Sequence, residues 1–308
     1  MNNKIEYIKH NAIDTGKWNT CIDNSYNGMV YGYSWFIEGM AGKKWDALIL
    51  NDYEAVFPLV WNKKYGLSYL YQPYFIQQLG IFSLLPLTTQ QIWNFFDTIP
   101  RKFSFREISL NASSRVFMPD TELSDRTTYI LDLNKPYHEL YDNYNADAKK
   151  NLAKSAIKQL DSINDVPVEK VVEYYKNAYG ALNPSVKPEV YEKIEALGKL
   201  AVLNGKAISL GVTGAGGELL AAGLFLISHS RAHYVLGAPS EEGKAYGATH
   251  TLIDAFIKQY AGTEMILDFE GSDIPTVAYF YSKFGSSPTT YYHLKQNLLP
   301  WWAKLLKK

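Results

Sequence analysis

The sequence predicts an α/β protein of the α+β type, built as two tandem units that each hold a mixed, largely antiparallel sheet flanked by helices. Two observations carry this prediction. The chain has 308 residues, 47% of them hydrophobic, which is enough for two globular domains with sizeable cores. Its predicted elements run in the order helices, strand meander, helix, strand and strand, and the second half repeats that order with one extra helix. We therefore expect domains at residues 1–134 and 135–308.

The first half shows short helical patterns, then period-two and aromatic-rich segments separated by turn residues, and then a helix that two threonines can cap. Its predicted elements are helices at 18–23 and 35–40, strands at 45–50, 55–61, 68–72 and 78–82, a helix at 88–96, and strands at 107–111 and 127–133.

The second half opens with a helix that joins the two domains, because Leu140, Tyr144 and Leu152 follow a spacing of three to four residues. Its predicted elements are helices at 137–160, 168–181 and 188–203, strands at 206–212, 218–228 and 232–238, a helix at 249–260, a strand at 265–269, a helix at 275–284, and a strand at 289–294.

Charge and cysteine content exclude several classes of protein. The 31 basic residues balance the 31 acidic ones, which disfavours binding to DNA. A single cysteine, Cys21, cannot form an internal disulfide, and neither an export signal nor a membrane-spanning apolar run is found. We therefore expect a cytoplasmic protein without a transmembrane segment. The tail from Leu298 to Lys308 combines tryptophan, leucine and lysine and can either touch a membrane surface or pack on the domain.

Two acidic residues, Asp268 and Glu270, lie at the end of a predicted buried strand. Their side chains are expected on the same face of that strand. Such a pair can supply a general base, or it can simply cap the helix that begins near Ile274. His229 and His233 lie four residues apart on a strand-turn-strand segment, where we expect no acidic or cysteine cluster to complete a metal shell. The sequence therefore predicts no metal site.

A glycine-containing turn precedes the predicted helix at 249–260, and it contains Gly243, Lys244, Gly247, Thr249 and Thr251. Free N–H groups at a helix N-terminus suit a phosphate or pyrophosphate. The alternative is a plain strand-to-helix turn with Thr249 as the N-cap.

Two further polar segments are candidates for substrate binding. Lys150 and Lys154 repeat at helical spacing and can bind an anion or remain solvated. Around Tyr74, three glutamines suit hydrogen-bonded recognition of a substrate but also an ordinary strand rim; they are Gln72, Gln77 and Gln78.

The motif Leu267-Asp-Phe-Glu-Gly-Ser272, followed by Phe280-Tyr-Ser-Lys-Phe-Gly285, resembles that of GNAT-like acyltransferases of the FemAB-type, tandem-domain kind. The segment 144–156 is similar to the basic helix before their second domain, and 72–80 to a segment of bacterial members. Two positions depart from the family pattern. Tyr281 stands where the family has a lysine, and the family's pyrophosphate loop is degenerate here as 244–249.

The resemblance implies transfer of an acyl group, with acyl-CoA as co-substrate and no tightly bound cofactor, to the amine of a small molecule or peptide. It implies Glu270 or Asp268 as the base, Tyr279 or Tyr281 as the acid, and phosphate binding by the 243–251 turn. The first domain, which lacks a glycine loop, would shape the acceptor site. Alternatives are an aminoacyl-tRNA-dependent peptidyltransferase acting on a cell-wall precursor, with tRNA as a partner, and a non-catalytic binding module of the same fold.

Overall fold

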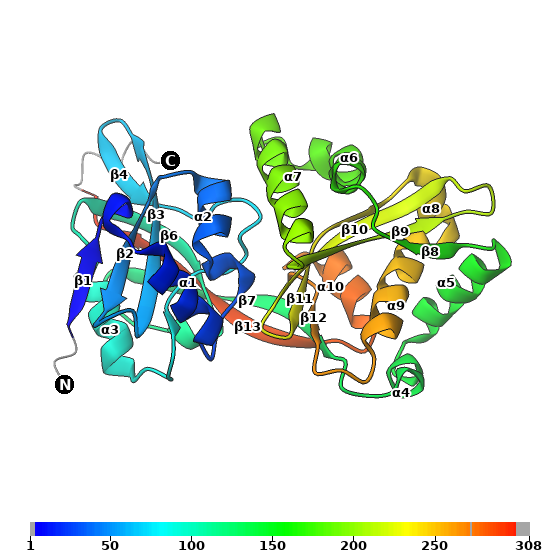
Figure 1. Cartoon of the computed structure of the whole chain (residues 1–308), viewed down its shortest axis with the longest axis horizontal. Helices are drawn as coiled ribbons and strands as arrows, with labels where there is room; N and C mark the ends of the chain where they lie inside the picture. Colours follow the sequence, from blue (N-terminus) through cyan, green and yellow to red (C-terminus); the bar gives the residue numbers. More distant parts are fainter. Residues whose placement is uncertain (1–3, 272, 300–308) are drawn as a thin grey trace. The chain divides into compact units, whose positions relative to one another are not determined.

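The computed structural model describes residues 4–271 and 273–299, and their contacts divide into two compact units (Figure 1). Unit 1 holds the described residues up to Arg126 and those from Thr290 onward, and unit 2 holds Thr127–Thr289. The division differs from the expected one at 134/135 in two ways: unit 2 begins at Thr127, and the chain returns to unit 1 at Thr290, where its last strand pairs. The C-terminal tail from 300 onward lies outside the described residues.

Unit 1 is a mixed sheet flanked by helices. Its elements are β1 (Ile5–Ile8), α1 (Thr15–Asn24), α2 (Ser34–Ala41), β2 (Trp45–Leu50), β3 (Ala55–Lys64), β4 (Leu67–Leu70), β5 (Phe82–Ser83), α3 (Thr89–Thr98) and β6 (Phe103–Leu110), with the C-terminal part of β13 (Ser287–Asn297). The strand order is β1-β2-β3-β4-β6-β13, and only β4 and β6 pair in parallel. Both faces of β2 are buried, and Trp18, Trp45 and Phe57 lie fully inside.

The strand expected at 78–82 is wrong. Residues 71–81 form an irregular loop, because the Gln72 side chain donates to the Ile76 carbonyl (2.7 Å) and accepts from the Ser109 amide (3.0 Å). Leu79 makes an isolated bridge to Leu110, and regular pairing resumes only at β5. The three other strands of the expected meander are β2, β3 and β4.

Unit 2 holds the remaining strands, with helices on both sides (Figure 1). Its elements are β7 (Thr121–Asp132, shared with unit 1), α4 (Tyr137–Asp142), α5 (Ala146–Ile157), β8 (Asp161–Asn164), α6 (Val168–Tyr179), α7 (Pro188–Leu203), β9 (Ala207–Thr213), β10 (Leu219–Ser228), β11 (Arg231–Pro239), α8 (Glu241–Tyr246), α9 (Ala248–Tyr260), β12 (Ile266–Asp268) and α10 (Pro275–Ser282). The strand order is β7-β12-β11-β10-β9-β8. Figure 1 shows α6 and α7 on one side of this sheet and α9 and α10 on the other.

The sheet of unit 2 opens between β11 and β12. These strands pair in parallel only over Arg231, Ala232 and His233, which lie opposite Ile266, Leu267 and Asp268. β12 then ends, whereas β11 continues to Pro239. A register shift against β10 near Leu224 distorts the same stretch of β11. The divergence leaves the β12 side of residues 234–239 without a strand partner in the described part of the chain.

The joining helix expected at 137–160 is divided into α4 and α5, with β8 beginning at Asp161. Asn145 starts the second helix, because its side chain accepts a hydrogen bond from the Ala148 amide (2.8 Å). Between the helices, Tyr144 turns inward to pack against Phe284 and donates to Asp254 (3.0 Å). No helix among residues 4–271 and 273–299 is both long enough and apolar enough to cross a membrane.

Candidate active site

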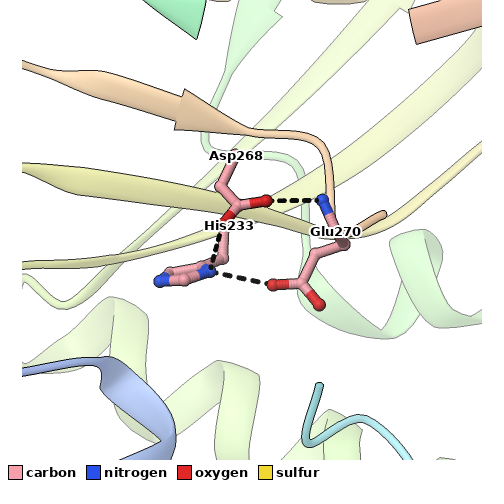
Figure 2. Close-up of side chains that lie close together, drawn as sticks. All are labelled: His233, Asp268 and Glu270. Atoms are coloured by element: carbon pink, nitrogen blue, oxygen red, sulfur yellow. Dashed lines mark hydrogen bonds and ion pairs between the residues drawn. The ribbon is translucent and has the colours of Figure 1, made fainter. Parts of the chain in front are cut away.

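Three side chains meet where β11 and β12 diverge. His233 Nδ1 lies 2.9 Å from Glu270 Oε1 and 3.7 Å from Asp268 Oδ2 (Figure 2). The parallel register sets this arrangement, because His233 on β11 lies opposite Asp268 at the end of β12. The two acids expected on one face are therefore brought together, with a histidine between them.

Asp268 is fully buried, and its partners come from neighbouring strands as well as from its own turn. Its carboxylate accepts from the Thr128 hydroxyl (2.6 Å) and from the Glu270 amide (3.0 Å), and it pairs with the Arg231 guanidinium (3.2 Å). Helix α10 begins at Pro275, and the side chain of its N-cap residue, Ile274, makes no capping hydrogen bond. Capping of this helix by the two acids stays an alternative. Asp268 holds the turn that carries Glu270.

Glu270 is the accessible carboxylate of the cluster. Its side chain is 15% exposed, whereas those of His233 and Asp268 are fully buried. Its backbone has φ of 63°, in the left-handed region that non-glycine residues rarely adopt. Strained backbone of this kind persists where the surroundings hold it, often at functional sites. Glu270 is thus the carboxylate of this cluster that is open to solvent.

The two tyrosines expected as acids have different surroundings. Tyr281 packs its ring on Phe269 (4.9 Å between centroids), and burial raises the pKa of its hydroxyl well above the usual value. The nearby Tyr179, Glu270, Tyr175 and Asp268 raise it further. Tyr279 is 57% exposed and its ring lies under the Lys283 ammonium (5.0 Å). Tyr281 is therefore packed beside Phe269, which lies between the two acids in sequence, whereas Tyr279 lies at the surface.

In the glycine-containing turn, local packing and backbone geometry explain both Gly243 and Gly247. A Cβ on Gly243 would lie 1.9 Å from the Leu220 carbonyl oxygen, so β10 requires a glycine there. Gly247 has φ of 82°, ends α8 and precedes α9, and a Cβ on it would approach the Asn151 carbonyl to 3.0 Å. Thr249 lies inside α9 and does not cap it. Lys244 is exposed, and the Thr251 hydroxyl is buried without a hydrogen-bond partner among the described residues. Phosphate binding by this turn stays a prediction.

The other expected binding residues lie elsewhere. Lys150 and Lys154 are exposed on α5. In unit 1, Gln72 fixes its own loop, and the buried Gln78 donates to Gln77 (2.7 Å). Tyr74 is 45% exposed. Their expected role in binding a substrate stays a prediction.

The expectation that no acidic cluster lies beside His233 is wrong. Within the described ranges, His233, Asp268 and Glu270 place one ligand atom each within 4.8 Å of one another, which is close enough for a metal ion. Those atoms already contact each other, and the positive Arg231 side chain occupies Asp268. The arrangement is therefore explained as an ionic and hydrogen-bonded network, and the absence of a metal stays a prediction.

Sequence reasoning missed Arg231, His233 and Thr128 as members of the site. The parallel register of β11 with β12 brings Arg231 and His233 to Asp268, and the antiparallel register of β7 with β12 brings Thr128 there. A strand-helix-strand pattern indicates which strands are neighbours, but it carries no signal for a register of single residues.

Comparison with known proteins identifies the fold. No family model and no curated protein sequence matches the chain. The crystal structure of FemX superposes with a TM-score of 0.68 at 11% identity, over 98% of this chain and 99% of FemX. The chain has the FemX fold. The expected FemAB-like, GNAT-type acyltransferase fold is confirmed.

Two further solved structures resemble this chain over most of their length. L-PGS from Bacillus licheniformis matches with a TM-score of 0.57 at 10% identity, over 95% of each chain. The C-terminal domain of a putative lysylphosphatidylglycerol synthetase from Agrobacterium fabrum matches with 0.55 at 9% identity, over 92% of this chain and 91% of that one. At these identities the similarity concerns the fold.

Proposed function

We propose that this protein transfers an acyl group from an activated ester or thioester to an amine, with Glu270 as the general base. The observation that carries the proposal is the partly exposed Glu270 carboxylate, held by His233 and by the Asp268-fixed turn where β11 and β12 diverge. A base is needed because an amine is protonated near neutral pH and cannot attack a carbonyl in that form.

In the proposed reaction, Glu270 accepts a proton from the acceptor ammonium, and the freed nitrogen attacks the donor carbonyl carbon. The negative charge that develops on the carbonyl oxygen requires N–H donors. Backbone N–H groups of residues 234–238 on β11 that point toward the β12 side can supply them, since no strand pairs with that side in the described residues. Collapse of the intermediate then breaks the bond to the leaving oxygen or sulfur, and the attacking nitrogen releases its second proton to water to give the neutral amide.

Tyr281 is the proposed acid toward the leaving group. Burial raises the pKa of its hydroxyl, which makes the phenol a weaker acid, so it can donate to a strongly basic alkoxide more readily than to a thiolate. The departing alkoxide takes that proton and the proton held by Glu270 restores Tyr281, whereas a departing thiolate can leave without a proton. Tyr279, which is more than half exposed, has no part in this scheme.

The test is a set of near-isosteric variants assayed for turnover. Glu270→Gln should lower kcat by roughly 10²- to 10⁴-fold with little change in donor binding, because only proton affinity is lost. Tyr281→Phe should slow the reaction, whereas the matched control Tyr279→Phe should leave it within about twofold. If Glu270→Gln keeps turnover within threefold of the parent, Glu270 is not the base.

Two donor classes are compatible with this chemistry. Acyl-CoA is the donor implied by the GNAT resemblance. An aminoacyl ester, as on aminoacyl-tRNA, is supported by the similarity to lysylphosphatidylglycerol synthetases over most of the chain. It is also supported by Gly243 and Gly247, because packing explains both glycines without a bound phosphate. Thermal shift and turnover with acetyl-CoA, longer acyl-CoAs and aminoacyl-tRNA separate the classes, since a ligand at 100 times its Kd stabilises by about 2.7 kcal/mol. No response to any donor would indicate a non-catalytic binding module.

A further inference from the structure

Helix α5 presents an uncovered basic face on unit 2. Its inner side buries Ala148 and Ser155, and the Ser155 hydroxyl donates to the Tyr246 carbonyl (2.8 Å). Its outer side exposes two lysines, three alanines and one isoleucine, and we name it the α5 face: Ala146, Lys150, Ala153, Lys154, Ala156 and Ile157. At 100° per residue, these six positions share one side of the helix. In Figure 1, α5 (green) lies at the outer edge of unit 2.

The lysines of the α5 face differ from those of neighbouring helices. On α6, Lys170 pairs with Glu173 (2.8 Å), and on α7, Lys199 pairs with Glu195 (2.8 Å) and Glu169 (3.3 Å). Neither Lys150 nor Lys154 makes an ion pair within the described part of the chain. The one acidic residue of α5, Asp147, is bound by Lys283 (2.5 Å). The α5 face therefore carries uncompensated positive charge.

An apolar side chain lies among these lysines. Ile157 is 81% exposed, and on a helix it falls on the same side as Lys150 and Ala153. Exposure of this apolar side chain to water is unfavourable, and its transfer to an apolar environment would lower the free energy. Tyr279 adds an amphipathic ring nearby, because it packs on Lys283, which in turn holds Asp147 at the start of α5.

We propose that the α5 face docks on an anionic lipid surface. Lysines are attracted to anionic headgroups, while Ile157 enters the boundary between headgroups and acyl chains. The alanines let the helix approach closely. The nucleic-acid alternative explains the lysines but leaves the exposed isoleucine without a role, because phosphates are bound by charge and bases by stacking on aromatic rings. The proposal is independent of Glu270 and of the donor.

The experiment measures sedimentation of the full-length chain with vesicles at 0.1 M salt. Vesicles of phosphatidylcholine with phosphatidylglycerol should bind it, and pure phosphatidylcholine vesicles should not. The double variant Lys150→Gln, Lys154→Gln should weaken binding about 30-fold, since each lysine contributes roughly fivefold near an anionic surface. Ile157→Ser should weaken it by about fivefold. Matched controls are Lys170→Gln with Lys199→Gln, and Leu203→Ser, which removes a leucine that is 84% exposed on α7. The controls should stay within twofold, and circular dichroism verifies folding.

Each other outcome overturns the proposal. Absence of binding to the anionic vesicles contradicts it directly. If the double lysine variant and its lysine control lost vesicle binding equally, binding would depend on the total charge of the protein and not on the α5 face. Retained binding in the double lysine variant would assign the attachment to another part of the chain. Binding to a 20-residue oligouridine that needs Lys150 and Lys154 but is unchanged by Ile157→Ser, with no preference for vesicles, would identify a nucleic-acid surface instead.

Discussion

His250 sits in the first turn of α9, buried between aromatic rings. Its ring meets Phe280 edge-on (5.0 Å between centroids), and its Nε2 has no hydrogen-bond partner in the described ranges. Burial lowers the pKa of His250 to about 4, and the nearby Lys283 ammonium acts in the same direction, against the opposite effect of Asp147. His250 therefore remains neutral in the folded protein at pH values where a free histidine takes up a proton.

The pH dependence of stability follows from this difference. Since the pKa is lower in the folded state than the unfolded value of about 6.5, the unfolded chain binds the proton first, and the free energy of unfolding falls as the pH drops from 6.5 toward 4. Between pH 7 and pH 5 the expected loss is about 2 kcal/mol. Urea titrations at both pH values should show it, and His250→Gln should remove that part of the loss. An equal loss in the variant would assign the effect to other groups.

At the scale of single residues, part of the candidate site can be predicted from the sequence. Asp268 and Glu270 are recognisable because they end a buried strand within a family-like motif. His233 is not recognisable from the sequence as a site residue, because its position beside the acids depends on the pairing of β11 with β12. The glycines in the turn at 243–251 suggest a phosphate-binding loop. Close packing against Leu220 and Asn151 explains these glycines without a bound phosphate. Glycine spacing alone does not distinguish a ligand loop from a close backbone contact.

At the scale of elements, Arg106 holds several segments of unit 1 together. It is 4% exposed, and it donates to the backbone carbonyls of Phe96, Ile99 and Phe103 and to the Gln296 side chain (2.9 Å). Burial lowers the pKa of its guanidinium to about 10. These bonds tie the end of α3 to β6 and to β13.

Arg106→Met should therefore destabilise unit 1 by about 3 kcal/mol, because it leaves several buried acceptors without a donor. Chemical denaturation measures the change, and Arg101→Met, at an exposed position, is the control with an expected effect below about 0.5 kcal/mol. A loss as small in Arg106→Met as in the control would mean that water replaces the guanidinium donors.

Most helices and strands follow from residue periodicity, and the exceptions have local causes. The pattern at 137–160 is helical throughout, so the break appears only when the Asn145 cap and the inward Tyr144 are seen. The strands β1 and β8 are four residues each, and β8 is exposed along its whole length, so neither gives a period-two signal.

At the scale of the whole molecule, unit 1 is discontinuous in sequence. Residues 105–110 of β6 pair with residues 292–297 of β13, so unit 1 needs both ends of the chain, whereas Thr127–Thr289 is contiguous. The sequence repeat indicates two units, but it does not reveal that the last strand pairs with the first unit, because strand exchange between units leaves no local pattern.

A fragment of residues 1–134 should consequently fail to fold stably, because it lacks the strand that covers β6 and the Gln296 partner of Arg106. A fragment of residues 127–289 should be soluble and melt cooperatively. Circular dichroism and the soluble yield of both fragments check this expectation. A cooperative transition in the 1–134 fragment at the temperature of the full chain would show that β13 is dispensable.

The discontinuity also sets an order for folding on the ribosome. β6 is complete once Leu110 has emerged, but its partner strand ends only at Asn297. At roughly 5–20 residues per second, that edge waits on the order of 10–40 s for its partner, while the whole of unit 2 is synthesised in between. The second unit can therefore fold before the first is finished. The nascent chain carries an open strand edge during this interval, which is when a chaperone would protect it most.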